Sequence, residues 1–165
     1  NKWSGIAGSM EKSIGIDWVL IAHSERRQFF GETDSTAAKR FLNAAKNGMN
    51  IIYCVGETLA ERESGQTETV LTRQVAAFAE TAVLQQRVPA GRALLQGNII
   101  CVAYEPVWAI GTGKTATIDQ ANEAHRHIRR EVARLVDQAT AEQLPILYGG
   151  SVTPKMPEIY SNSQI

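Results

Sequence analysis

Four short apolar segments do most to restrict the fold of this chain. They cover residues 18–22, 51–55, 99–104 and 145–148, and they start roughly 33 to 48 residues apart. Each is almost continuously hydrophobic rather than alternating, which is typical of strands that are covered on both faces in a parallel sheet. We therefore expect four buried, parallel β-strands.

Helical patterns fill the stretches between these strands. Apolar side chains recur at helical spacing in three segments, 36–47, 67–86 and 119–138, and more weakly in two others, 8–14 and 154–160. Gly48 is a stop signal for the first of these helices, and Asp119 is a candidate N-cap for the third. The alternation predicts a single α/β domain of successive βα units with right-handed crossovers.

The composition excludes several classes of protein. Of the 165 residues, 44% are hydrophobic and 21% are charged, as in ordinary globular domains, and 17 basic side chains balance 17 acidic ones. Without a basic excess we expect no nucleic-acid partner. No apolar run approaches the ~18 residues of a membrane helix, so we expect no membrane partner. Cys54 and Cys101 lie outside any C-x-x-C pair, which predicts buried, reduced thiols and a cytoplasmic protein.

Two residues that directly follow strands are candidates for catalysis, since active sites of βα folds form at the carboxyl ends of the strands. His23 follows the first strand, and Ser24 and Glu25 suit a helix start, whose partial positive charge keeps a nearby imidazole neutral. Glu105 follows the third strand, where desolvation can raise its pKa toward that of a general base. By position alone, a structural histidine and an ion-paired glutamate remain open alternatives.

The segment after Glu105 has the composition of a lid. Pro106 stiffens its entrance, the Gly-Thr-Gly patch at 111–113 supplies flexibility, and the residues between are apolar. Such a loop can fold over a ligand and exclude water, although an ordinary surface loop with an exposed tryptophan is the alternative. The predicted lid comprises Pro106, Val107, Trp108, Ala109, Ile110, Gly111, Thr112, Gly113, Lys114 and Thr115.

A glycine-rich turn follows the fourth strand. Gly149, Gly150 and Ser151 offer backbone N–H groups and a hydroxyl to an anion such as phosphate, as does the N–H of Gly111, although a plain turn is the alternative.

Other binding motifs do not fit the sequence. A P-loop would need glycine at the position of Trp108, and the G-x-G-x-x-A match at 111–116 is separated from its strand. The cysteines and the histidines have no metal-ligand spacing, so we expect no metal.

Four longer motifs together resemble the triosephosphate isomerase family. They are AHSERRQFFGET at 22–33, CVGETL at 54–59, AYEPVWAIGTGK at 103–114 and LYGGSV at 147–152. They occur in the family's order and span nearly the whole chain. The resemblance implies a (β/α)8 TIM barrel in which these strands are the fourth to the seventh, so that residues 1–165 form one incomplete barrel domain.

The resemblance also implies a reaction: the interconversion of dihydroxyacetone phosphate and glyceraldehyde 3-phosphate in glycolysis and gluconeogenesis, by a homodimer without cofactor or metal. Glu105 would be the base, and His23 the neutral electrophile that stabilises the enediolate, in what is a long-established example of pKa tuning. Glu25 would be an active-site acid that interacts with the family's catalytic lysine. The substrate phosphate would be bound by Gly111 and Ser151, with Gly149 and Gly150.

The chain departs from the family's pattern in two places. The Asn-x-Lys segment that supplies the lysine has no equivalent, and the last strand, with a Gly-Gly pair, would follow Ile165. A closed barrel has no edges, whereas four parallel strands have two, and the lysine supplies electrostatic stabilisation. We therefore expect these 165 residues alone to be inactive or nearly so. The alternative function is a catalytically inactive barrel fragment that acts as a structural or self-associating module.

Overall fold

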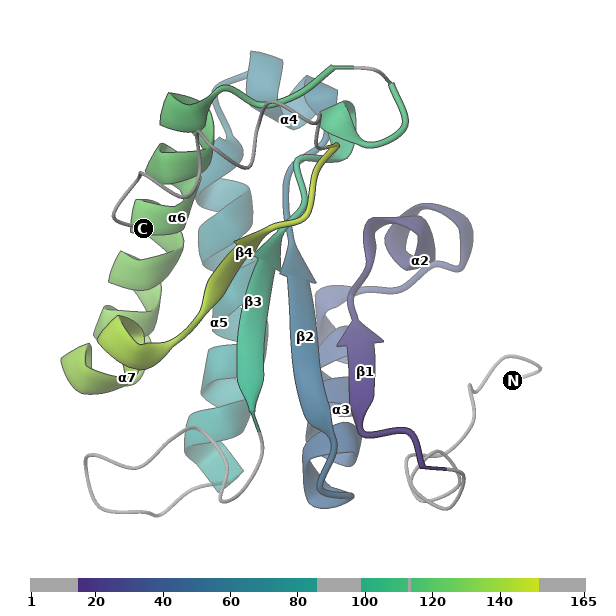
Figure 1. Cartoon of the computed structure of the whole chain (residues 1–165), viewed down its shortest axis with the longest axis vertical. Coiled ribbons are helices and arrows are strands. Elements are labelled where there is room, and N and C mark those ends of the chain that lie inside the picture. Colours follow the sequence, from purple (N-terminus) through teal and green to yellow (C-terminus); the bar gives the residue numbers. More distant parts are fainter. Residues whose placement is uncertain (1–14, 86–98, 113, 152–165) are drawn as a thin grey trace.

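Four strands form one parallel sheet, in the order β1-β2-β3-β4 (Figure 1). The structure, a computed structural model, describes residues 15–85, 99–112 and 114–151. The strands are β1 Trp18–Ile21, β2 Asn50–Val55, β3 Ile100–Tyr104 and β4 Ile146–Tyr148. The prediction of four parallel strands is confirmed, but the expected burial on both faces is wrong for β1 and β4, which carry exposed residues. Neighbours in the chain are neighbours in the sheet, as the strands of a TIM barrel are.

Helices occupy the crossovers between the strands. They are α2 Ser24–Phe29, α3 Asp34–Lys46, α4 Leu59–Glu63, α5 Thr67–Gln85, α6 Ile118–Leu135 and α7 Gln138–Gln143, with a 3-10 helix, η1, at Val107–Ala109. The three long predicted helices correspond to α3, α5 and α6, whereas the predicted helices at 8–14 and 154–160 lie outside the described residues.

The predicted N-cap of α6 is wrong. Thr117, not Asp119, caps this helix: its hydroxyl accepts from the N–H of Gln120, whose side chain accepts from the Thr117 N–H in return. This reciprocal capping box satisfies two of the first amides of the helix and places Asp119 inside the first turn.

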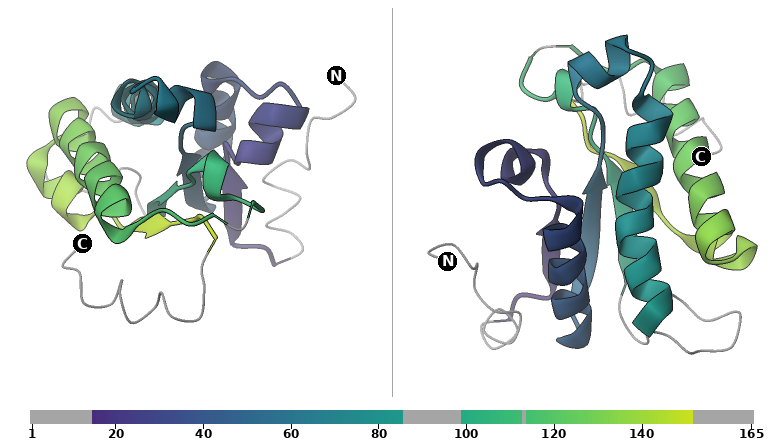
Figure 2. Two further views of the ribbon diagram at one scale, coloured as in Figure 1. Left: turned by 90° about the horizontal axis from the view of Figure 1, so that it is seen from above. Right: turned by 180° about the vertical axis from the view of Figure 1, so that it is seen from behind.

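The long helices cover one face of the sheet (Figures 1 and 2). On that face, α3, β2 and α5 meet in a cluster of Phe41, Tyr53 and Phe78, whose ring centroids lie 4.8 to 5.9 Å apart. All three side chains are fully buried. Their packing fixes the helix layer against the strands and so fixes where the strands end.

The opposite face of the sheet carries apolar side chains that are partly open to solvent. Trp18, Leu20 and Leu147 are 44 to 46% exposed. In a TIM barrel this face is the packed interior. The described residues therefore have the architecture of one side of such a barrel. No helix in the described part of the chain has the length and hydrophobicity needed to cross a bilayer.

Candidate active site

The two predicted catalytic residues lie together at the carboxyl edge of the sheet. The Nε2 atom of His23, after β1, lies 3.4 Å from Oε1 of Glu105, after β3. The other carboxylate oxygen of Glu105 accepts a hydrogen bond of 3.2 Å from the N–H of Ser24. The fold thus brings a ring nitrogen and a carboxylate from distant parts of the sequence into one polar site.

His23 is held at the start of α2. It is the N-cap residue, and its Nδ1 atom accepts a hydrogen bond of 3.3 Å from the N–H of Glu25. A ring nitrogen that accepts a hydrogen bond carries no proton, so this contact favours the tautomer with its proton on Nε2, the atom that faces Glu105. This is the protonation state that the predicted electrophile requires.

Glu105 is a buried carboxylate, only 6% exposed. Burial raises its pKa above the usual value, and this is partly offset by His23, the Ser24 N–H, the Cys54 thiol and the Arg27 guanidinium. A carboxylate with a raised pKa holds a proton more readily, as a general base must.

Two glycines make room for Glu105 because they have no side chain. A Cβ atom on Gly56 would lie 1.8 Å from the carbonyl oxygen of Glu105, and a Cβ atom on Gly149 would lie 2.9 Å from its Cγ. Gln74 of α5 fixes Gly56, because its Oε1 accepts from the Gly56 N–H at 2.7 Å and its Nε2 donates to the Gly56 carbonyl at 3.2 Å. The residue after β2 therefore packs against the backbone of Glu105, and the residue after β4 packs against its side chain.

Comparison with known proteins agrees with this geometry. Residues 4–165 match the family model of triosephosphate isomerase. The chain belongs to the triosephosphate isomerase family. Among curated relatives, the triosephosphate isomerase of Geotalea uraniireducens is 50% identical over 150 residues, which cover 91% of this chain and 56% of the relative. That of Ralstonia nicotianae is 48% identical over 149 residues (90% and 56%), and that of Cupriavidus necator 44% identical over 161 residues (97% and 61%). The chain spans a little over half the length of these relatives.

The first half of the lid expected in the triosephosphate isomerase family is anchored on Glu57, whose role sequence reasoning missed. Glu57 is fully buried, and its Oε1 accepts from the Trp108 indole at 2.9 Å and from Arg62 at 3.1 Å. The Tyr104 hydroxyl lies 3.1 and 3.2 Å from the two oxygens, and the Arg62 guanidinium stacks 4.8 Å from the Trp108 ring centroid. Trp108 is therefore an anchored residue rather than an exposed loop tryptophan. The only signal in the sequence was a glutamate close after a strand.

The predicted lid segment is also tied to the turn after β4, at Ala109 within it and at Ala116, one residue beyond it. The Ser151 hydroxyl donates to the Ala109 carbonyl at 2.6 Å, and the Tyr148 hydroxyl accepts from the Ala116 N–H at 3.1 Å. A Cβ atom on Gly150 would lie 2.3 Å from the Tyr148 hydroxyl, so this contact requires glycine there. The described lid residues are thus fastened at both ends in this conformation.

The residues predicted to bind phosphate lie in these two segments. Gly111 is exposed in the lid with a left-handed φ of 69°, and Ser151 faces the lid from the β4 turn. The Gly149 N–H donates to the Tyr104 carbonyl at 2.8 Å, so it is not free for an anion in this conformation. Gly113 lies outside the described residues. Phosphate binding by this set stays a prediction.

Glu25 orients His23 through its backbone, while its side chain is exposed to solvent. Its predicted role as an acid stays a prediction. Cys54 and Cys101 are buried and free, as expected. Among the described residues, no three histidine, cysteine or acidic side chains are grouped so that they could hold a metal ion.

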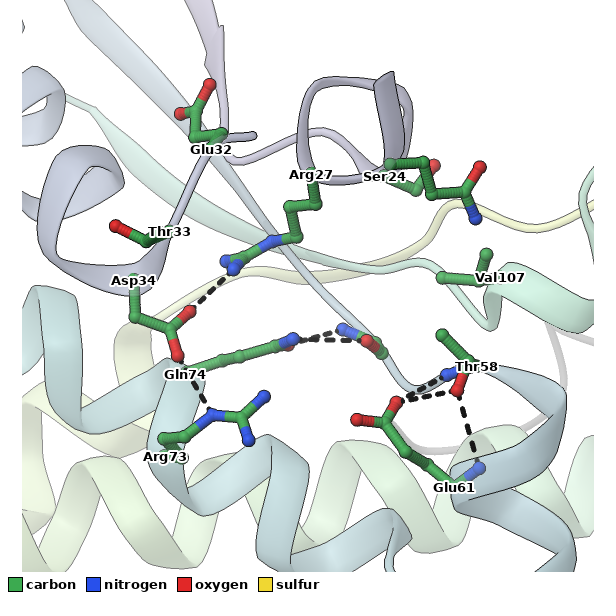
Figure 3. Close-up of a pocket in the computed structure, with 12 residues that line it drawn as sticks. Ser24, Arg27, Glu32, Thr33, Asp34, Thr58, Glu61, Arg73, Gln74 and Val107 are labelled. Atoms are coloured by element: carbon green, nitrogen blue, oxygen red, sulfur yellow. Dashed lines mark hydrogen bonds and ion pairs between the residues drawn. The ribbon is translucent and has the colours of Figure 1, made fainter. Parts of the chain in front are cut away.

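A cavity of about 260 Å³ lies between the end of β2 and the helices α2 to α5, and neither His23 nor Glu105 lines it (Figure 3). It is lined by Ser24, Arg27, Gln28, Glu32, Thr33, Asp34, Gly56, Thr58, Glu61, Arg73, Gln74 and Val107. Many of its polar groups pair with one another, as the Arg27–Asp34–Arg73 chain and the Thr58–Glu61 capping box show. This paired network supports the strand ends that carry His23 and Glu105.

Proposed function

We propose that the protein is a triose-phosphate isomerase that interconverts dihydroxyacetone phosphate and glyceraldehyde 3-phosphate. One observation carries the proposal: the Nε2 atom of His23 and the buried carboxylate of Glu105 face each other across 3.4 Å at the strand ends. The name of these relatives, triosephosphate isomerase, supports the choice of substrate.

The two side chains have complementary roles in this reaction. The Glu105 carboxylate takes a proton from the carbon beside the carbonyl and returns it to the neighbouring carbon. As the proton leaves, its electron pair moves onto the carbonyl oxygen and forms an enediolate. The His23 Nε2–H donates a hydrogen bond to that oxygen and stabilises the developing charge. The hydroxyl proton on the deprotonated carbon passes to that oxygen before the carbon proton returns, so the carbonyl and the hydroxyl exchange places. No cofactor takes part in this scheme.

The remaining site residues bind the substrate and exclude water. We infer that the Gly111 N–H and Ser151, with Gly150 and Gly149, bind the phosphate, and that the lid at 106–115 shields the enediolate from solvent. Glu25 supplies an acid at the edge of the site. We further propose that the active protein is a cytoplasmic homodimer.

An isomerase assay with glyceraldehyde 3-phosphate tests the proposal. It is run on the purified chain and on a chimera in which these residues replace the matching segment of the Geotalea relative. The chimera restores family segments that these residues lack, so we expect it to be active and the 165 residues alone to be weak or silent. Glu105→Gln and His23→Gln should each reduce the kcat of the chimera by about 100-fold or more. A chimera that folds but shows no turnover, or that keeps its kcat after Glu105→Gln, would contradict the proposed function.

A further inference from the structure

The turn that leads from β1 to His23 has an unusual backbone. Ala22 has a φ of 64°, and among the described residues it is the only one other than glycine in the left-handed region. An L-residue avoids this region because its Cβ atom crowds the following carbonyl. Such a conformation persists only where the surroundings determine it, and it is often found at functional sites.

The Arg27 side chain holds this turn. Its Nε atom donates a hydrogen bond of 3.0 Å to the carbonyl of Ala22, from the same short helix that His23 begins. Ala22 is almost fully buried, so its carbonyl has little access to water that could replace this bond. The hydrogen bond therefore fixes the direction of the peptide group between Ala22 and His23.

Arg27 is itself fixed at its other end. Its Nη1 atom lies 2.5 Å from Asp34 of α3, whose second oxygen accepts from Arg73 of α5 at 2.9 Å (Figure 3). The guanidinium thus links the Ala22 turn to two helices of the layer behind the sheet. A planar guanidinium can make both bonds at once, whereas a lysine ammonium at the end of a flexible chain cannot reproduce this geometry.

The His23 ring depends on this turn because packing alone does not hold it. Its side chain is 28% exposed, and the described contacts of its ring nitrogens are the Glu25 N–H and Glu105. A rotation of the preceding peptide group would move the ring away from both partners. Misplacement by about 1 Å in an active site can reduce a rate about 100-fold.

We propose that Arg27 is a positioning residue that aims His23 at Glu105 by holding the left-handed turn at Ala22. This inference rests on the proposed function for its consequence in catalysis, but the orientation of the ring is measured without the reaction. Burial of the Ala22 carbonyl, the link to Asp34 and the exposure of the His23 ring all support it.

The test is ¹⁵N NMR of the histidine rings in the full chain, which has three histidines, with the His23 signals assigned by their loss in His23→Gln. In Arg27→Lys we expect the Nδ1 and Nε2 signals of His23 to shift toward the average of the two tautomers. Arg73→Lys is the matched control, since Arg73 binds the same aspartate but not Ala22, and it should leave these signals in place. Wherever turnover is measurable, Arg27→Lys should lower kcat about 10- to 100-fold and change KM by less than about twofold.

A second variant tests the turn itself. Glycine adopts the left-handed conformation without strain, so Ala22→Gly added to Arg27→Lys should return the His23 signals at least halfway to their original positions. If Arg27→Lys does not fold, Asp34→Asn takes its place as the test. It keeps the shape of the side chain that Arg27 binds but removes its charge, so the His23 signals should shift in the same direction by a smaller amount.

Unchanged His23 signals in folded Arg27→Lys, an equal shift in Arg73→Lys, or no recovery in the double variant would each overturn the proposal. In a chain that proves to have no isomerase activity, the expected shifts would still support this inference while the proposed function fails. An active chain in which Arg27→Lys leaves the signals unchanged would instead support the proposed function and overturn this inference.

Discussion

Glu57 and Glu105 are buried carboxylates that follow neighbouring strands, yet their surroundings differ. Glu57 is fully buried and accepts hydrogen bonds from three side chains, those of Arg62, Tyr104 and Trp108. Glu105 is 6% exposed, and the groups that reach it are a backbone N–H at 3.2 Å, the His23 ring at 3.4 Å and the weak thiol of a nearby cysteine. Burial is nearly the same for the two, so what separates them is the supply of strong donors.

This difference suits the two carboxylates to the roles we propose for them, Glu57 as a structural anchor and Glu105 as the base. Charge-assisted hydrogen bonds stabilise the ionised form, so a carboxylate with several strong donors has little tendency to take a proton. A carboxylate that is buried with few donors has a raised pKa and accepts a proton more readily. The hydrogen bonds of Glu57 hold Trp108 of the predicted lid in place, while the shortage of strong donors around Glu105 suits it to the proposed proton transfer.

The largest expected effect tests the structural side of this comparison. Glu57→Gln removes the charge that Arg62 pairs with and puts an amide donor among three donors. We expect the free energy of unfolding, measured by chemical denaturation, to fall by about 4 kcal/mol, as when a buried ion pair loses one partner. Glu63→Gln, on the exposed face of α4, is the control and should stay within about 0.5 kcal/mol of wild type. If both variants lost the same free energy of unfolding, Glu57 would not be an anchor of the predicted lid segment.

The parts of the fold that follow from the hydrophobic pattern could be predicted from the sequence. The four strands were predictable because each is a continuous apolar run, and His23 and Glu105 were found because a polar residue directly after such a run faces the active-site edge. The α6 cap was misplaced because Asp119 and Thr117 are both good capping residues, and only the reciprocal bond with Gln120 decides between them.

The supporting contacts could not be read in the same way. Glu57 meets Tyr104 and Trp108 across 47 and 51 residues of sequence, and no periodic pattern encodes a contact of that range. The left-handed turn at Ala22 is hidden for another reason: alanine gives no sign of a positive φ, whereas glycine would have. Long-range hydrogen bonds and backbone strain are therefore the part of the site that only the structure shows.

A second prediction concerns His125, whose ring packs edge-on against Tyr104, with ring centroids 6.1 Å apart. Burial, with a smaller contribution from Arg129, lowers the pKa of His125 to about 4 from an ordinary 6.5. The unfolded chain takes up this proton before the folded chain does, so stability is lost as pH falls from 6.5 toward 4. The loss amounts to about 3 kcal/mol at most.

His125→Gln should remove this part of the acid sensitivity in urea denaturation measured at several pH values. The rest of the acid response, which comes from carboxylates, serves as the internal control because both proteins share it. If the free energies of unfolding of wild type and variant changed in parallel between pH 6.5 and 4, water would have to reach the His125 ring despite its burial. The neighbouring Tyr104, one of the donors to Glu57, would then also be more hydrated than its burial indicates.

A third prediction tests the packing around the base. In Gly149→Ala the new methyl group would lie 2.9 Å from Cγ of Glu105, so the side chain must move. In an active protein or chimera we expect kcat to fall about 100-fold, which corresponds to about 2.7 kcal/mol, with a smaller change in KM. Glu105→Gln/Gly149→Ala should be no worse than Glu105→Gln alone, since a displaced base and an absent base fail in the same step. A kcat within twofold of wild type in Gly149→Ala would show that Glu105 does not need this glycine.

The smallest expected effect is that of Glu105→Gln on stability. It should stabilise the protein at higher pH, whereas Glu57→Gln should destabilise it. Because the folded-state pKa of Glu105 is raised by burial, the folded protein holds this proton more tightly than the unfolded chain does. The resulting contribution to stability is present at low pH and is lost as pH rises through the raised pKa. Glutamine does not titrate, so the stability of Glu105→Gln relative to wild type should increase as pH rises from about 4 to 8, even though the variant turns over more slowly. Denaturation of both proteins across this range measures the difference in their free energies of unfolding.

The opposite result would be free energies of unfolding that change in parallel, or a variant that becomes less stable relative to wild type as pH rises. The carboxylate of Glu105 would then be as well supplied with donors as that of Glu57. Its suitability as a base would then have to come from its position beside His23 rather than from its burial.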